Sequence, residues 1–139
     1  MNLLYPYTVL ADEDGRYVVQ FVDLEEAFTE GGTPHEAAFH AAQVLSLVLQ
    51  QRLEDDVPIP QPSASADLPT AAPEASVQAA LLMRWARELD GRTISGLARA
   101  MHTSWPAAQR LEQPNSNPTL KQLERAAAAL GRRLVLSMV

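Results

Sequence analysis

Four acidic residues near the N-terminus have the side chains and the closeness in sequence that a metal site needs. Asp12, Glu13, Asp14 and Asp23 would lie near one another in a hairpin, and carboxylate oxygens are the ligands that Mg²⁺ takes in two-metal nucleases. A structural interpretation competes: Asp14-Gly15 is a turn pair, Asp12 and Glu13 flank it in solvent, and Asp23 marks a strand end. Turn and strand-end positions account for all four residues, so we favour this structural interpretation over metal chemistry.

Nothing else in the sequence completes a catalytic set. The chain has no cysteine, so disulfides and thiol chemistry are excluded and a zinc site is disfavoured. Of the three histidines, His35 falls in the first turn of a predicted helix, while His40 and His102 have no ligand partner at a suitable spacing. We therefore predict that the protein is not an enzyme and has no catalytic residue, no metal and no cofactor.

The charged residues divide the chain into an acidic and a basic part. Residues 1–56 carry eleven acidic and two basic side chains, a net charge of −9, whereas residues 76–139 carry four acidic and nine basic ones, a net charge of +5. Such a division favours two partners of opposite sign, phosphates for the basic part and something cationic for the acidic part. Two solvated surfaces of unlike composition are the plainer alternative.

Composition limits the size and location of the protein. Hydrophobic residues make up 47% of the 139 residues, which is enough for a packed core in one average domain or two small ones. No apolar run approaches the roughly 20 residues of a membrane helix, and the N-terminus does not resemble a signal peptide. We expect no membrane association and a cytoplasmic location.

The elements that would position the acidic residues form a small β-β-β-α module over residues 1–56. Two β-rich runs flank Asp14-Gly15, which is a strong hairpin signal, and a third strand is expected around residues 27–30. Thr33 and Pro34 then begin a helix that runs to about Leu53, with Glu36 at the capping-box position. Its apolar stripe, which would cover the sheet, comprises Ala38, Ala41, Ala42, Leu45, Val48 and Leu49.

A Pro-rich segment follows the module. Residues 57–76, VPIPQPSASADLPTAAPEAS, hold five of the ten prolines. Because proline fixes φ and lacks a backbone donor, we predict an extended, semi-rigid linker, with an edge strand around residues 57–60 as an alternative.

The basic part, residues 77–139, is predicted to be four helices and a terminal strand. Helices are expected at about 77–89, 94–101, 105–111 and 119–130. After Gly131, Leu134, Leu136 and Met138 alternate with other residues as in a strand. Because the helical domain offers no sheet to join, this strand is expected to pair with its copy in a second chain, giving a homodimer or a tetramer.

Residues 93–131, TISGLARAMHTSWPAAQRLEQPNSNPTLKQLERAAAALG, resemble a helix-turn-helix of the Cro/repressor (Xre-like) type. Pro106 is tolerated in its recognition helix because Ser104 can be the N-cap, and amides of the first turn lack intrahelical partners. The resemblance implies binding to operator DNA, with the start of this helix in the major groove. The predicted DNA-binding residues are Thr93, Ser95, Ser104, Trp105, Ala107, Gln109, Arg110, Asn115, Ser116 and Lys121. The alternatives are a buried anchor for Trp105 and an ion pair with Glu112 or Glu124 for Arg110.

Residues 7–42, YTVLADEDGRYVVQFVDLEEAFTEGGTPHEAAFHAA, resemble the HicB antitoxins, as does the VPIPQPS exit after the helix. This resemblance implies a partial ribonuclease-H-like fold that binds and covers HicA, a small mRNA-cleaving toxin with a catalytic histidine, while a C-terminal domain represses the shared operon. The predicted toxin-binding residues are Tyr7, Tyr17, Phe21, Asp23, Glu25, Glu26 and Phe28. The alternative for Tyr17 and Phe21 is a place in the core.

Taken together, the predicted fold is α+β: a HicB-like module, a Pro-rich linker, and an all-α helix-turn-helix domain with a dimerising strand. The leading hypothesis is an antitoxin that neutralises a HicA-type toxin and represses its own operon. The alternative is a stand-alone transcription regulator whose N-terminal domain senses a ligand or only dimerises.

Overall fold

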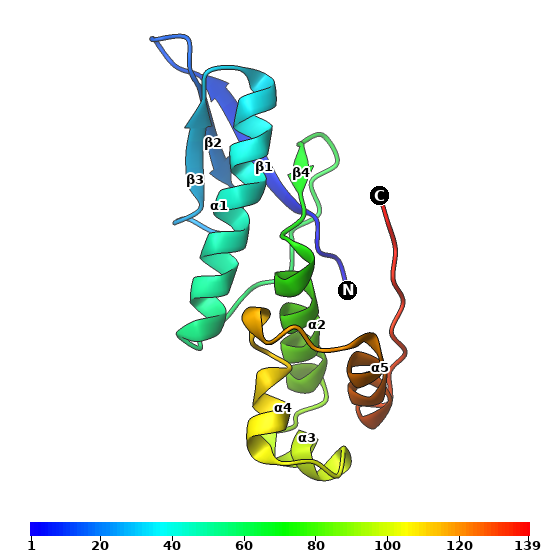
Figure 1. The fold of residues 1–139 in the computed structure, drawn as a ribbon. Coiled ribbons are helices and arrows are strands. Elements are labelled where there is room, and N and C mark those ends of the chain that lie inside the picture. The colour runs from blue at the N-terminus through cyan, green and yellow to red at the C-terminus, as the bar shows by residue number, and fades with distance from the viewer. The chain divides into compact units, whose positions relative to one another are not determined.

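The computed structural model describes all 139 residues, which form two compact units, Met1–Ala75 and Ser76–Val139. The first holds a small sheet and a long helix, and the second is helical (Figure 1). No helix combines the length and the apolar character needed to cross a membrane. The predicted α+β class is confirmed.

The sheet of the first unit has four strands, β1 (Tyr5–Ala11), β2 (Tyr17–Phe21), β3 (Phe28–Gly31) and β4 (Thr70–Ala71). Their order is β3-β2-β1-β4 and all neighbours are antiparallel. The hairpin predicted around Asp14-Gly15 is confirmed, since β1 pairs with β2 from Tyr7 opposite Phe21 to Ala11 opposite Tyr17. Gly15 has a φ of +76°, which glycine adopts without steric cost.

Helix α1 (Pro34–Glu54) covers one face of this sheet. The Thr33 hydroxyl accepts the N–H of Glu36 at 3.1 Å, which confirms the predicted start. The predicted apolar stripe is partly wrong: the buried row is Ala37, Ala41, Leu45, Leu49 and Leu53, while Ala38 is exposed. An unbroken i, i+4 spacing selects this row, and it begins one residue earlier than the predicted one.

The segment after α1 remains part of the first unit. Thr70 and Ala71 form edge strand β4, opposite Pro6 and Tyr5, and the Tyr7 N–H donates to the Pro69 carbonyl at 3.0 Å. The alternative of an edge strand at residues 57–60 is therefore wrong, since these residues have no regular structure. The Pro-rich segment therefore pairs with the sheet at Thr70 and Ala71, two residues that are not proline and that form a short strand beside β1.

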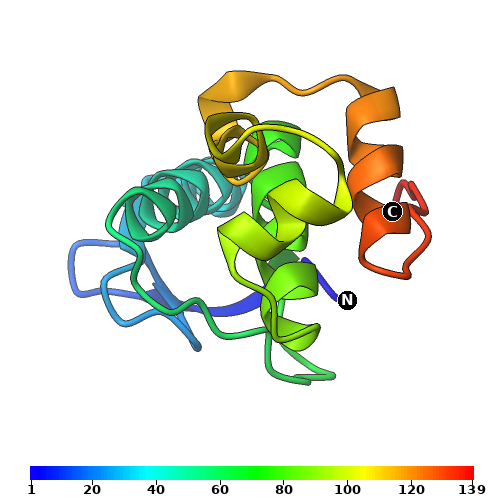
Figure 2. The same cartoon turned by 90° about the horizontal axis from the view of Figure 1, so that it is seen from below.

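The second unit contains α2 (Ala75–Leu89), α3 (Ile94–Ala100), α4 (Trp105–Arg110), a 3₁₀ turn, η1 (Pro114–Ser116), and α5 (Leu120–Ala129). All four predicted helices are confirmed. Helices α3 and α4 lie side by side, as Figure 2 shows from below. A common core joins the four helices, built from Met83, Ala86, Leu97, Ala98, Met101, Ala108, Leu111, Leu123, Ala126 and Leu130.

The residues after Gly131 contain no helix or strand in the single chain. Leu134 packs against the core of the second unit, whereas Leu136 is 68% exposed and Met138 is fully exposed. A strand here needs a partner strand from a second chain, so the dimerising strand stays a prediction.

Candidate functional site

Among the acidic residues of the hairpin, Asp12 stabilises the turn, and Glu13 and Asp14 are exposed. The Asp12 carboxylate accepts the N–H groups of Asp14 and Arg16, both at 2.9 Å. No group of three or more histidine, cysteine, aspartate or glutamate side chains is arranged so that it could hold a metal ion. The turn interpretation therefore holds for this cluster, and the metal-nuclease hypothesis has no ligand set.

The aromatic residues predicted to contact a toxin fall on two faces of the sheet. Tyr7 and Phe21 pack together in the core, with ring centroids 5.3 Å apart, on the face that α1 covers. They offer no surface to a partner, because strand alternation turns them inward. Tyr17 is half-buried, and Phe28 is 62% exposed on the opposite face. Of these aromatic residues, Phe28 is the most exposed.

Asp23 fastens the Pro-rich segment to the sheet. Its carboxylate accepts the backbone N–H of Ser63 at 2.9 Å and also the Ser63 hydroxyl. Nearby, the Tyr5 hydroxyl donates to the Pro60 carbonyl at 2.7 Å. Burial raises the pKa of the Tyr5 phenol far above its usual value, and the charge of Asp23 adds to this shift. Asp23 thus has a structural role that sequence reasoning missed, because its partner lies forty residues away.

Glu26 forms the best-defined ion pair of the first unit. Arg52 Nε and Nη2 donate to its two carboxylate oxygens at 2.7 and 2.8 Å, and Arg52 Nη1 donates to the Pro58 carbonyl at 2.8 Å. The hydrogen bond from Arg52 holds the pKa of Glu26 below its usual range. The hydrogen bond to Glu26 raises the pKa of Arg52, and the charge of the exposed Glu25 adds to this shift.

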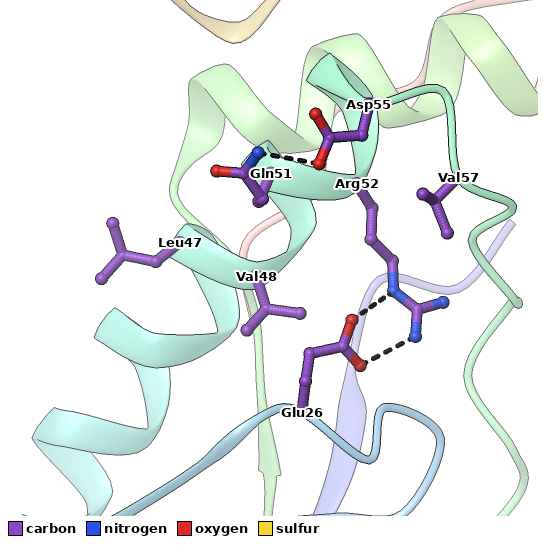
Figure 3. A pocket seen from close by; sticks show the side chains of 7 residues that line it. All are labelled: Glu26, Leu47, Val48, Gln51, Arg52, Asp55 and Val57. Atoms are coloured by element: carbon purple, nitrogen blue, oxygen red, sulfur yellow. Dashed lines mark hydrogen bonds and ion pairs between the residues drawn. The ribbon is translucent and has the colours of Figure 1, made fainter.

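A groove of about 260 Å³ opens beside this ion pair. Figure 3 shows Leu47 and Val48 projecting from α1, with Val57 on the far side of the Glu26–Arg52 pair. Gln51 and Asp55 complete the lining and are joined by a 2.9 Å hydrogen bond. Sequence reasoning missed Leu47 and Val57; the signal was that Leu47 lies off the buried row of α1.

In the second unit, the hydroxyls predicted to meet phosphates cap helices. Thr93 accepts the Gly96 N–H at 3.0 Å at the start of α3, and Ser104 accepts the Ala107 N–H at 3.2 Å at the start of α4. In these bonds each hydroxyl is an acceptor, which leaves its own proton for another partner. Ser116 differs, because its hydroxyl donates to backbone carbonyls of Arg110 and Gln113.

Trp105 and Arg110 both face solvent from α4. Trp105 is 46% exposed, so it is not a buried anchor. Arg110 is exposed and makes no ion pair, because Glu112 is occupied by Arg84 and Arg87 of α2. The alternatives considered for both residues are therefore wrong. The other predicted contact residues Ser95, Asn115 and Lys121 are exposed, while Ala107 and Gln109 are half-buried.

Comparison with known proteins identifies the chain's family. The family described as the HicB-like antitoxin of bacterial toxin–antitoxin systems matches residues 4–78. The chain belongs to this family. Antitoxin HicB of Escherichia coli (strain K12) is 33% identical over 137 residues, which cover 97% of this chain and 99% of that protein. Antitoxin HicB 1 of Photorhabdus laumondii subsp. laumondii is 30% identical over 141 residues, which cover 99% of this chain and 88% of that protein.

The HicB-like match coincides with the first structural unit, since it ends at residue 78 and the unit ends at Ala75. Both relatives also align with the helical second unit. The HicB-like chain is thus an antitoxin of a toxin–antitoxin system, and membership of this family implies a toxin partner. The family predicted from residues 7–42 is confirmed.

Proposed function

We propose that the chain binds and neutralises a small, basic, mRNA-cleaving toxin of the HicA type through its first unit, in the cytoplasm. The observation that carries this proposal is the HicB-like match over residues 4–78. The charge of residues 1–56 supports it, because a net charge of −9 attracts a cationic protein and competes with the RNA phosphates that this protein would bind. The order β-β-β-α of this unit fits the partial ribonuclease-H-like fold that we propose for it.

Co-expression tests this part of the proposal. The small basic protein encoded beside this chain's gene should arrest growth when produced alone, and the chain should relieve the arrest and purify with that protein through a moderate salt wash. If the chain instead purified as a homo-oligomer free of any protein partner, a stand-alone transcription regulator would be the better assignment.

We further propose that the second unit binds operator DNA and represses the chain's own operon. The exposed Trp105 and Arg110 support a recognition role for α4, since neither is buried in the core and Arg110 is not held in an ion pair. Arg110 would read guanine O6 and N7, and Trp105 would contact a thymine methyl or a sugar. Around them, Thr93, Ser95, Asn115 and Lys121 would hold phosphates, while Leu134, Leu136 and Met138 would join two chains on a palindromic site.

Binding to the DNA upstream of the chain's gene tests this second part. Affinity should fall steeply with salt, and Arg110→Ala should lower affinity for the preferred site by about 1–3 kcal/mol and relax sequence choice. Arg16→Ala removes the same charge from the first unit and is the matched control. Unchanged sequence choice in the Arg110 variant would show that α4 does not read bases.

A further inference from the structure

The groove beside the Glu26–Arg52 pair is an apolar surface that the first unit leaves uncovered. Leu47 is 66% exposed although it lies within a helix whose other face is fully buried. Val57 is also exposed, and Val48 is half-buried. At about 260 Å³ the groove is smaller than the roughly 300–1,000 Å³ of small-molecule sites. It has room for one or two side chains of a partner protein.

The charges around this groove favour one kind of side chain. Glu26 and Asp55 line it, Glu25 precedes Glu26 in the chain, and Glu54 precedes Asp55. Arg52 is the one cation in the lining, and it is held by Glu26. The Glu54 and Asp55 carboxylates accept N–H groups from Gln50 and Gln51, which carry no charge. The rim therefore keeps a net negative charge.

Because Glu54 and Asp55 lie at the end of α1, the excess of negative charge is unfavourable when no partner is bound. Glu54 is the last residue of α1 and Asp55 is its C-cap. The carbonyl end of a helix carries partial negative charge and prefers cations. Two carboxylates at this end, beside exposed apolar carbon, are electrostatically suited to a cation that arrives from outside the chain.

We propose that this groove seats an arginine or lysine side chain of the toxin, with the aliphatic stem against Leu47 and Val48 and the cationic head at Asp55. Long basic side chains combine an apolar stem with a charged tip, which matches a groove with an apolar floor and an acidic rim. The inference rests on the proposed toxin-binding function and names the surface of the first unit that performs it.

Two leucines of the first unit allow a matched test. Leu47 is 66% and Leu10 is 70% exposed, but Leu10 lies on the sheet face opposite α1, next to Val18 in the register. The probe is the small basic protein encoded beside this chain's gene, made as a variant without its catalytic histidine, and the full chain is titrated against it. Leu47→Arg should weaken binding ~30-fold or more because it fills the groove with a like charge, whereas Leu10→Arg should change binding by less than about 3-fold.

A second substitution changes the charge of the groove rim without filling the groove. Asp55→Lys should also weaken binding and reduce its dependence on salt, while thermal unfolding should show that each variant keeps its fold. Tight binding by the wild-type chain that survives Leu47→Arg and Asp55→Lys would overturn the groove assignment and leave the antitoxin function standing. A loss confined to Leu10→Arg would overturn it in favour of the open sheet face. No binding by the wild-type chain would overturn the proposed toxin partner together with the groove.

Discussion

Each unit of the molecule contains an arginine–glutamate cluster, and the two clusters differ in burial. In the first unit the Glu26 side chain is 46% exposed and has one arginine partner. In the second unit the Glu112 side chain is 4% exposed and accepts from Arg87 at 2.6 and 2.9 Å and from Arg84 at 3.4 Å. The buried cluster fixes the end of α4 to α2, whereas the exposed pair borders a groove. Arginine and glutamate therefore stabilise the packing of helices in the second unit, whereas in the first unit they line a surface groove.

Replacing the two glutamates should separate these roles most strongly. Glu112→Gln should lower the free energy of unfolding by about 3 kcal/mol, because it leaves two arginines beside a neutral group in a buried site. Glu26→Gln should lower it by less than about 1 kcal/mol, because water screens the exposed pair. Urea denaturation of both variants measures the difference. Equal losses would mean that burial does not distinguish the clusters.

Close backbone packing in the first unit should contribute more to its stability than the Glu26–Arg52 ion pair does. A Cβ added to Gly31 would lie 2.4 Å from the Ala37 nitrogen, so strand β3 and helix α1 would have to separate. We expect Gly31→Ala to cost about 2 kcal/mol of stability through this overpacking. Gly32→Ala is the control, since its Cβ would meet nothing closer than 3.7 Å. A similar loss in both variants would contradict close packing as the cause.

Sequence reasoning predicted local structure well in both units and long-range structure poorly. Helix starts at Thr33, Thr93, Ser104 and Thr119 follow from capping residues that act within three positions. Strand β4 was missed because a two-residue strand carries no periodic signal. The Glu112 cluster was missed because its members lie 25 and 28 residues apart.

The candidate sites also contain features that local sequence predicts and features that depend on long-range packing. Exposure of Trp105 and Arg110 agreed with their predicted place on α4, which follows from helix periodicity. Tyr7 and Phe21 were placed in the toxin contact by residue type, but the side of the sheet that α1 covers decides their burial. The groove is lined by Leu47 and Val48 of α1 and by Val57 and Glu26 from other segments, and only the folded backbone brings these segments together.

The turns of the two units offer a smaller contrast. The β1–β2 turn uses Gly15 at φ +76°, whereas the connection between α3 and α4 has His102 at φ +53°. A side chain in this left-handed region is strained by about 1 kcal/mol. His102→Gly should therefore stabilise the second unit by ~0.5 kcal/mol, after allowing for the greater freedom of glycine in the unfolded chain. His102→Ala, which keeps a Cβ, should not stabilise it, and thermal unfolding compares the two.

The smallest expected effect is the pH dependence of the exposed pair. Arg52 lowers the pKa of Glu26 in the folded state below its usual value of 4.5. The unfolded chain therefore binds this proton more readily, so the contribution of the pair is fully present above about pH 4.5 and is lost as the pH falls through the lowered pKa. The unfolding free energy of the wild-type chain should thus approach that of Glu26→Gln between pH 5 and pH 3, with a difference of a few tenths of a kcal/mol at neutral pH. A gap that widens as the pH falls would have the wrong sign for this pair and would assign the acid sensitivity to another carboxylate.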